Sequence, residues 1–215
     1  MIDFDLDGRG VACLTLQRAE KHNALSQDLI DGLHEAARQI AARADIRVVI
    51  LTGAGPTFCA GGDLGWMRAQ MSGDDAMKRA AARSLADMLG ALNTLPQPLI
   101  GRVQGNAFGG GVGLTCVCDV VIAADHAKFG LTETKLGLVP ATIGPYVLAR
   151  MGEAHARRVL MSSRIFSAIE ASVLGIVSQV VPQAQLDDAV EAEVAAYLQC
   201  APGAVAACKA YARSL

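Results

Sequence analysis

Two glycine-rich turns and one downstream carboxylate are the residues of this chain best suited to do chemistry together. The first turn is Phe58-Cys59-Ala60-Gly61-Gly62-Asp63-Leu64, and the second is Gly105-Asn106-Ala107-Phe108-Gly109-Gly110-Gly111. Tight geometry alone explains most glycine-rich turns. Two of them, however, can aim bare backbone N–H groups at one point and form an oxyanion hole, while the carboxylate of Glu133 moves protons. Together they predict an enzyme that stabilises developing negative charge.

The familiar phosphate-binding and hydrolase motifs do not fit these turns. A G-x-G-x-x-G motif fails because the last position is Leu114 when counted from Gly109, and Phe58 when counted from Gly53. No G-K-[ST], G-x-S-x-G or H-E-x-x-H sequence occurs. Dinucleotide, nucleoside triphosphate, serine-hydrolase and zinc-protease functions therefore lose support.

The composition favours one α/β domain that works on small molecules. The chain has 215 residues, of which 52% are hydrophobic and 19% charged, with a net charge of -2. No basic stripe exists to bind nucleic acid, and no run of about 18 uncharged apolar residues exists to span a membrane. The acidic start Met1–Asp5 lacks the pattern of a signal peptide, so we expect a cytoplasmic protein. The alanine-rich apolar content predicts a subunit interface.

The six cysteines predict no metal centre. Cys116-Val117-Cys118, even with His126 nearby, lacks paired C-x-x-C spacing. Because most of the six lie among apolar residues, we expect nearly all of them to be buried thiols.

Strand-like and helix-like segments alternate along the chain and predict an α/β fold. Expected strands are residues 10–16, 46–52, 99–103, 120–124, 128–130 and 175–181. Expected helices begin after Ser26, span about 74–95, open at the glycine triplet, span about 153–161, follow a capping box at Ser167, and fill 186–215.

Five motifs in order resemble the enoyl-CoA hydratase/isomerase family, the crotonases. Besides the two turns, these are Lys21-His22-Asn23-Ala24-Leu25-Ser26, Cys118-Asp119 and Phe129-Gly130-Leu131-Thr132-Glu133. The resemblance runs from about Gly10 to the chain end. It implies a crotonase-like spiral of repeated β-β-α units that holds a coenzyme A thioester, with no separate cofactor.

The resemblance also implies how the chain is organised. Residues 1–185 correspond to the spiral core with the CoA-thioester site, and 186–215 to the start of a helical C-terminal oligomerisation region. Family members continue beyond the segment Ala204–Ala212 with further helices, so we expect this part to be truncated. The implied partners are an acyl-CoA thioester and copies of the chain in a homotrimer or a dimer of trimers, with no nucleic acid or membrane.

Site residues carry over by motif. The two oxyanion donors are expected to be the backbone N–H groups of Ala60 and Gly110, and Glu133 is the expected acid/base. The resemblance assigns substrate and CoA binding to a set that lies on the Lys21–Leu25 loop and on both turns: His22, Ala24, Ala60, Gly61, Gly62, Asp63, Leu64 and Gly110. We expect the side chain of Asp63 to shape its turn rather than to touch the acyl group. An exposed loop position explains His22 equally well.

Gly113 stands where hydratases of this family commonly have a first glutamate. With one carboxylate, Glu133 can add water to a 2-enoyl thioester or shift the double bond of a 3-enoyl thioester. Family isomerases often keep only the later glutamate. The stretch Phe129–Val147, however, is similar to hydratases of branched or carboxylated enoyl thioesters such as methylglutaconyl-CoA, so we favour a hydratase over an isomerase. An inactive acyl-CoA-binding protein is the third alternative.

The sequence does not identify the acyl group. Residues that can line its pocket, or equally pack in the core, are Trp66, Met67, Met71, Met88, Leu138 and Tyr146. A glutaconyl substrate needs a positive partner for its distal carboxylate, and Arg68, Lys135 and Arg150 remain open for that role.

Overall fold

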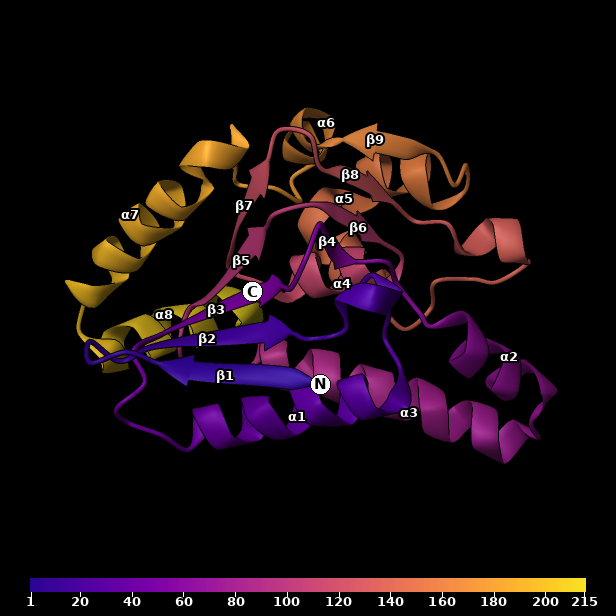
Figure 1. Ribbon diagram of the computed structural model, residues 1–215, viewed down its shortest axis with the longest axis horizontal. Coiled ribbons are helices and arrows are strands. Elements are labelled where there is room, and N and C mark those ends of the chain that lie inside the picture. The colour runs from indigo at the N-terminus through magenta and orange to yellow at the C-terminus, as the bar shows by residue number, and fades with distance from the viewer.

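The largest element of the fold is a six-stranded sheet. A computed structural model describes all residues 1–215. In this sheet the strands lie in the order β1, β2, β3, β5, β7, β10, and only β1 runs antiparallel to its neighbour. Figure 1 shows β1, β2 and β3 side by side above helices α1 and α3. The strand bounds are Ile2–Leu6, Val11–Leu16, Val48–Gly53, Leu99–Val103, Val120–Ala124 and Gln179–Val181.

A smaller sheet contains four strands of three residues each. These are β4 (Thr57–Cys59), β6 (Asn106–Phe108), β8 (Lys128–Gly130) and β9 (Ile165–Ser167). β4, β6 and β8 are parallel, and β9 pairs antiparallel with β8. The chain passes from β3 to β4, from β5 to β6 and from β7 to β8, and each pair of strands leads into helical structure. The predicted spiral of β-β-α units is therefore confirmed.

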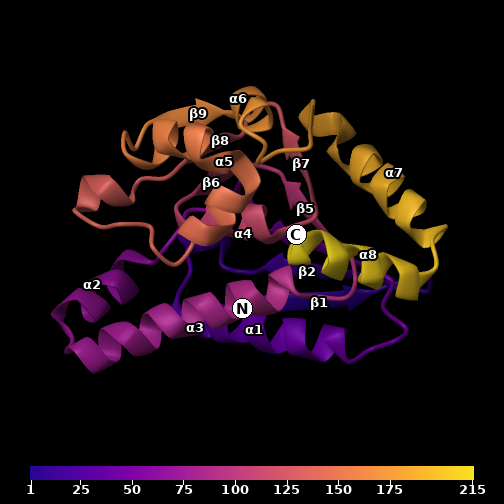
Figure 2. The same ribbon diagram turned by 180° about the vertical axis from the view of Figure 1, so that it is seen from behind.

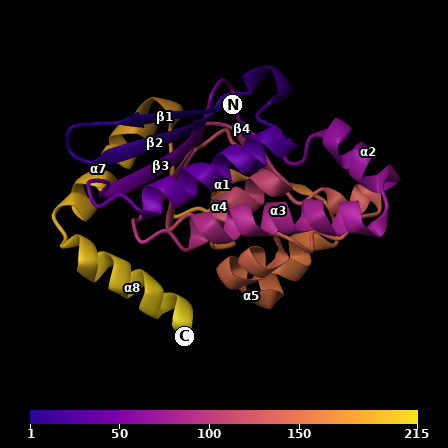
Figure 3. The same ribbon diagram turned by 90° about the horizontal axis from the view of Figure 1, so that it is seen from below.

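Helices enclose the two sheets. Figure 3 shows α1 and α3 running side by side, which agrees with their direct packing. The helix bounds are α1 Gln27–Ala41, α2 Leu64–Ser72, α3 Asp75–Asn93, α4 Gly110–Val117, α5 Gly144–Leu160, α6 Ala168–Val173, α7 Leu186–Leu198 and α8 Pro202–Ser214, with 3-10 turns at Ala19–Lys21, Glu133–Leu136 and Gln183–Gln185.

Side-chain caps set several helix starts where the sequence predicted them. The Ser26 side chain accepts a hydrogen bond from Leu29 N–H at the start of α1, and Asp74 accepts from Met77 N–H at α3. Ser167 likewise accepts from Glu170 N–H. The reciprocal half of that capping box is absent, because the Glu170 carboxylate binds Arg164 instead.

Two predicted helices differ from those found, and one helix was missed. The helix expected from about residue 153 begins at Gly144 and is kinked at Gly152, whose backbone has φ 69° and ψ 162°. The stretch 186–215 is two helices, because the chain turns between Leu198 and Pro202, and proline is favoured in a first helical turn. Helix α2 was not predicted.

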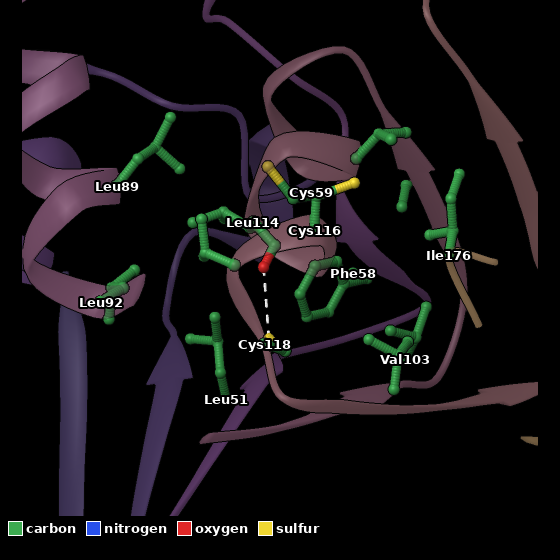
Figure 4. Packing of buried hydrophobic residues seen from close by; sticks show 14 of the residues in the cluster. Leu51, Phe58, Cys59, Leu89, Leu92, Val103, Leu114, Cys116, Cys118 and Ile176 are labelled. Atoms are coloured by element: carbon green, nitrogen blue, oxygen red, sulfur yellow. Dashed lines mark hydrogen bonds between the residues drawn. The ribbon is translucent and has the colours of Figure 1, made fainter. Parts of the chain in front are cut away.

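The main core lies between the large sheet and helices α1, α3 and α4. Forty-two buried residues form it, and a second cluster of nine packs between the other sheet face and α7. Neighbouring residues alternate between the two clusters, as Val48 and Val49 do on β3, because successive side chains on a strand point to opposite faces. In Figure 4, Leu51 and Val103 from the sheet surround the buried face of α4 with Leu89 and Leu92 from α3.

The last two helices differ in how firmly they are held. α7 contributes three residues to the second core cluster, and its Asp187 pairs with Arg102 at 2.6 Å. α8 has no buried residue and lies apart from α5 and α3 in Figure 3. Its Lys209 reaches Asp119 at 2.6 Å. Figure 2 shows α7 and α8 along one side of the molecule, and the oligomerisation role of 186–215 stays a prediction.

No helix in the structure is long and apolar enough to cross a membrane.

Candidate active site

The three predicted chemical segments meet at one edge of the smaller sheet. β4 leads into Ala60–Asp63, β6 into Gly109 and Gly110, and β8 into Glu133. Because β4, β6 and β8 are parallel neighbours, their carboxyl ends lie side by side. Binding sites of open α/β sheets form outside such ends. Segments up to 73 positions apart in the sequence, from Ala60 to Glu133, therefore share one site.

A cavity of about 210 Å³ occupies this edge. Glu133 is its only ionisable residue, and most of the other lining residues are apolar or glycine. The full lining is Leu25, Ala60, Gly61, Gly62, Leu64, Trp66, Met67, Leu85, Gly109, Gly110, Thr132, Glu133, Leu136, Val139, Pro140, Ala141, Thr142 and Ile143.

One oxygen of the Glu133 carboxylate is buried and lacks a hydrogen-bond partner. It opens the 3-10 turn Glu133–Leu136, and its Oε2 atom is fully buried without a hydrogen-bond partner. Burial raises the pKa of this carboxyl above its usual value, with an opposing contribution from its own backbone N–H. A group that binds protons more tightly than an ordinary glutamate, and has no partner to neutralise it, suits proton transfer.

Gly109 allows the carboxylate to approach the second turn. Its φ of 49° lies in the region that favours glycine, and an added Cβ would lie 3.0 Å from Glu133 Oε1. The next residue, Gly110, is the first of α4, where an N–H group has no intrahelical acceptor. Gly110 N–H therefore has no acceptor within α4, and its role as an oxyanion donor stays a prediction.

Ala60 does not offer its N–H group as predicted. Ala60 lines the cavity, but its N–H donates to the His22 carbonyl oxygen at 3.0 Å. The free donor of this turn is Gly62. Gly62 forms a parallel bridge with Leu25, in which Leu25 N–H binds Gly61 O and Asp63 N–H binds Leu25 O, so the N–H of Gly62 itself points away from Leu25.

The two turns touch through Gly61. An added Cβ there would lie 2.8 Å from Phe108 O and 3.5 Å from Gly110 N, and the φ of Gly61 is 92°. A side chain at this position would push the turns apart. Gly61 therefore keeps the N–H groups of Gly62 and Gly110 on neighbouring walls of one cavity.

No other acidic residue of the cavity takes the place of the glutamate that many family members have at the position of Gly113. A Cβ at Gly113 would lie 2.5 Å from Ile143 Cγ2, so the Ile143 side chain fills the space beside this glycine. Ile143 is 3% exposed and also lines the cavity. The cavity wall beside Gly113 is thus apolar. A second carboxylate would fit there only if the Ile143 side chain moved.

The predicted CoA-binding residues separate into two groups. Gly61, Gly62 and Leu64 line the cavity with Ala60 and Gly110. Asp63, His22 and Ala24 do not.

Those three residues support the turns from behind. Asp63 caps α2 by accepting from Trp66 N–H at 2.9 Å and pairs with Arg18 at 2.9 Å. The hydrogen bond from Trp66, followed by that from Arg18, holds the Asp63 pKa below its usual value despite burial. Asp63 thus shapes its turn as expected. The exposed His22 ring bonds to Thr57 Oγ1 at 3.1 Å, and Ala24 O accepts from Arg18.

Other pocket expectations are corrected by the cavity lining. Trp66 and Met67 line it, whereas Met88 is a fully buried core residue. Met71 and Leu138 are outside the lining, and Tyr146 lines a neighbouring cavity. None of the three basic candidates, Arg68, Lys135 and Arg150, lines the cavity, and Arg150 Nε donates to Cys116 O.

Sequence reasoning missed Leu25, Leu85 and Ile143 as lining residues. Leu25 lies within the motif Lys21–Ser26, so the sequence could have identified it as a lining residue. Ile143 also lies within the stretch Phe129–Val147 but was not assigned to the pocket, and Leu85 carries no local signal.

The cysteines are less uniformly buried than expected. Cys59, Cys116 and Cys118 are buried, and burial raises the pKa of their thiols to about 12. Cys13 is half-buried, and Cys200 and Cys208 are exposed. The structure contains no group of three or more His, Cys, Asp or Glu that could hold a metal ion.

Comparisons with known proteins agree with this geometry. Residues 7–214 match the profile of the family described as enoyl-CoA hydratase/isomerase. The enoyl-CoA hydratase ACTT6 of Alternaria alternata is 34% identical over 97% of this chain and 68% of its own length. The human mitochondrial methylglutaconyl-CoA hydratase is 35% identical over 85% of this chain and 54% of its own. The chain therefore spans between half and about two thirds of these relatives.

A solved structure extends the similarity to three dimensions. The crystal structure of an enoyl-CoA hydratase from Shewanella pealeana superposes with a TM-score of 0.96 at 37% identity. The match covers 100% of this chain and 80% of that one. With the family profile, the relatives and the fold in agreement, the chain belongs to the enoyl-CoA hydratase/isomerase family, the crotonases.

Proposed function

We propose that this protein adds water across the double bond of a 2-enoyl-CoA. One observation carries the proposal: the partnerless Glu133 carboxylate and the free N–H of Gly110 face the same small apolar cavity. That arrangement suits a thioester whose carbonyl oxygen gains charge while a neighbouring carbon gains or loses a proton. The hydratase names of the relatives support water addition over other reactions of such enolates.

The reaction has two proton steps, both through Glu133. The carboxylate takes a proton from water as the water oxygen bonds to the β-carbon. The electron pair of the double bond then moves into the thioester, whose oxygen accepts hydrogen bonds from Gly62 and Gly110 N–H. Glu133 next returns the proton to the α-carbon, so the product gains one water and the carboxylate is regenerated. Gly62 takes the role first expected of Ala60, because Ala60 N–H is occupied by His22 O.

Isomerisation of a 3-enoyl-CoA is the second candidate, favoured by one observation. Ile143 fills the space beside Gly113, so the cavity has no second acid to orient water. In this reaction Glu133 removes an α-proton and returns it at the γ-carbon, with the same N–H groups holding the enolate. A single shuttle suffices for that chemistry.

Ultraviolet absorbance of the conjugated thioester separates these activities. Crotonyl-CoA should lose its absorbance if the protein is a hydratase, and 3-hexenoyl-CoA should gain it if the protein is an isomerase. Absence of both changes, with measurable binding of acetoacetyl-CoA, would contradict both reactions and leave a thioester-binding protein.

Assembly is proposed from the family alone. A homotrimer, or a dimer of trimers, should appear as such by light scattering after size-exclusion chromatography, whereas a monomer would contradict it.

A further inference from the structure

The turn that carries Glu133 has one hydrogen bond to a distant part of the chain. None of the residues of the turn Glu133–Leu136 is classed as buried. The backbone hydrogen bonds of residues 132–138 close within that segment, as from Leu138 N–H to Glu133 O at 3.1 Å. The bond that leaves the segment joins the hydroxyls of Thr134 and Ser163, which are 29 positions apart. It is therefore the one polar link that fixes the turn against the rest of the fold.

The segment after this turn is bordered by two cavities. Val139, Pro140 and Ala141 line both the active-site cavity and a second, largely apolar cavity of about 440 Å³. Glu133 lines only the first cavity, and Thr134 lines only the second. These neighbouring residues thus face different cavities, so Thr134 is free to anchor the turn without touching a substrate. A wall bordered by open space has few packing contacts to hold it in place.

Ser163 provides a buried anchor for that wall. It is 1% exposed, and the Thr134 hydroxyl is the only hydrogen-bond partner of its side chain. The next residue, Arg164, binds the Glu170 carboxylate of α6 at 2.8 Å. The strand that follows, β9, pairs with β8, which leads into Glu133. The bond between the two hydroxyls therefore lies just beyond the end of this strand pair and continues its hold on the chain.

The backbone of Ser163 supports a role for its hydroxyl. Its φ is 49°, in the left-handed region that glycine adopts readily and that other residues seldom occupy. Glycine would suit this backbone better but has no hydroxyl to bind Thr134. Because strained residues of this kind cluster at active sites, the serine points to a task at the nearby carboxylate.

We propose that Ser163 is a positioning residue, which holds Glu133 at the active-site cavity through its hydrogen bond to Thr134. The inference rests on the proposed function, in which one carboxylate must reach both the attacking water and the α-carbon. Misplacement of a reacting group by about 1 Å can lower a rate by about 10²-fold. Without the bond the turn spends part of its time out of place, so kcat falls, while the walls that bind the thioester remain.

The test removes the hydrogen bond from either side and compares turnover with binding. Thr134→Val keeps the shape of the side chain without its hydroxyl, and Ser163→Gly removes the other hydroxyl while suiting the backbone. Both should lower kcat about tenfold, with KM and the Kd for acetoacetyl-CoA within about twofold. Thr134→Ser keeps a hydroxyl and should retain kcat to within about twofold. The substrate is crotonyl-CoA, or 3-hexenoyl-CoA if the natural protein is an isomerase.

A matched control is Thr94→Val, because the Thr94 hydroxyl bonds only to carbonyl oxygens of α3. It should leave kcat unchanged. An unchanged kcat in Thr134→Val would overturn the proposal. An equal loss in Thr134→Ser would also overturn it, because the hydroxyl would then not be the cause.

Hydrogen exchange gives a readout that needs no turnover. Deuterium uptake across residues 132–138, followed by mass spectrometry, should rise in Thr134→Val and Ser163→Gly but not in Thr134→Ser or Thr94→Val. If the natural protein converts neither thioester, the proposed function fails, and this uptake still tests whether the bond holds the turn. Uptake that stays at the natural level in Thr134→Val would overturn the positioning role in either case.

Discussion

The two sheets of this molecule differ in what they leave unsatisfied. The six-stranded sheet is covered on both faces by apolar clusters, and five of its strands have five or six residues. The smaller sheet has three-residue strands, and at its carboxyl edge lie backbone N–H groups without an acceptor and a buried carboxylate oxygen, Glu133 Oε2, without a donor. The large sheet supplies most of the buried apolar core. The smaller sheet positions polar groups that have no partner in the folded chain.

This difference between the sheets explains why glycines occupy the turns at the candidate site. A folded chain normally pairs its buried polar groups, because an unpaired group costs about 1–3 kcal/mol. Here Gly61 and Gly109 let two turns and Glu133 approach one another without side chains to separate them. Of the four buried side-chain atoms without a hydrogen-bond partner, only Glu133 Oε2 belongs to a residue that lines the candidate site. Changes at the small-sheet edge should therefore affect turnover far more than stability, and changes in the large sheet should do the reverse.

The largest effect is expected from Glu133→Gln. The amide keeps the shape of the side chain but cannot accept and return a proton, so kcat should fall by about 10²–10⁴-fold. Binding of acetoacetyl-CoA, measured by calorimetry, should change little because the oxyanion donors remain. A variant with turnover within tenfold of the natural protein would show that Glu133 is not the proton carrier.

Removal of the Gly110 N–H group should have the next largest effect. Gly110→Pro deletes the donor at a first helical position, where proline is tolerated, and should lower kcat by about 10²–10³-fold. Gly110→Ala is the matched control, because it keeps the N–H and its Cβ, 2.7 Å from Leu25 Cδ1, requires only that the end of this side chain shift. Similar kcat values for the two variants would exclude Gly110 as a donor. Circular dichroism would verify that both remain folded.

The large sheet should respond in the opposite way. Leu51 is fully buried in the main core, so Leu51→Ala should lower the free energy of unfolding by about 2–5 kcal/mol. Ile50, its neighbour on β3, is only half-buried, so Ile50→Ala should cost less. Urea denaturation measures both, and turnover per folded molecule should stay within about twofold. A selective loss of turnover in Leu51→Ala would break the distinction between the sheets.

The same contrast explains what the sequence could predict. Strands 99–103, 120–124 and 128–130 were predicted with the bounds found. The first two are largely apolar segments that follow Pro98 or Asp119 and end before Gln104 or Asp125. β1, β4, β6 and β9 were missed, and the last three have only three residues each, too few to show a periodic pattern. β8 is equally short and was predicted only as the extended piece before Glu133. Gly110 and Glu133 were assigned through the resemblance of their motifs to those of the family.

Ala60 was a different case. Which N–H of a turn is free depends on pairing with distant residues, here His22 and Leu25, and the local sequence does not encode that. Ile143 beside Gly113 was equally beyond reach, because 30 positions separate them in the sequence.

The smallest effect we predict is on how the free energy of unfolding depends on pH. It tests whether the Glu133 carboxylate lacks a stabilising partner in the folded protein. Burial raises the Glu133 pKa above 4.5 in the folded protein, so the folded state binds the proton more tightly than the unfolded state. The natural protein therefore loses stability as pH rises from 4.5 through the raised pKa, and Glu133→Gln should escape that loss. The variant's advantage in free energy of unfolding should be absent below pH 4.5, grow above it and then level off.

Glu170→Gln provides an internal control of opposite sign. The hydrogen bond from Arg164 holds the Glu170 pKa below 4.5, so this carboxylate stabilises the fold above that pH and stops doing so as pH falls through its lowered pKa. Urea denaturation measures the free energy of unfolding across the pH range. At neutral pH this free energy should be higher in Glu133→Gln than in the natural protein, and lower in Glu170→Gln. If both variants lost stability at neutral pH, Glu133 would be a satisfied structural carboxylate. The contrast between the two sheets would then not extend to their charged groups.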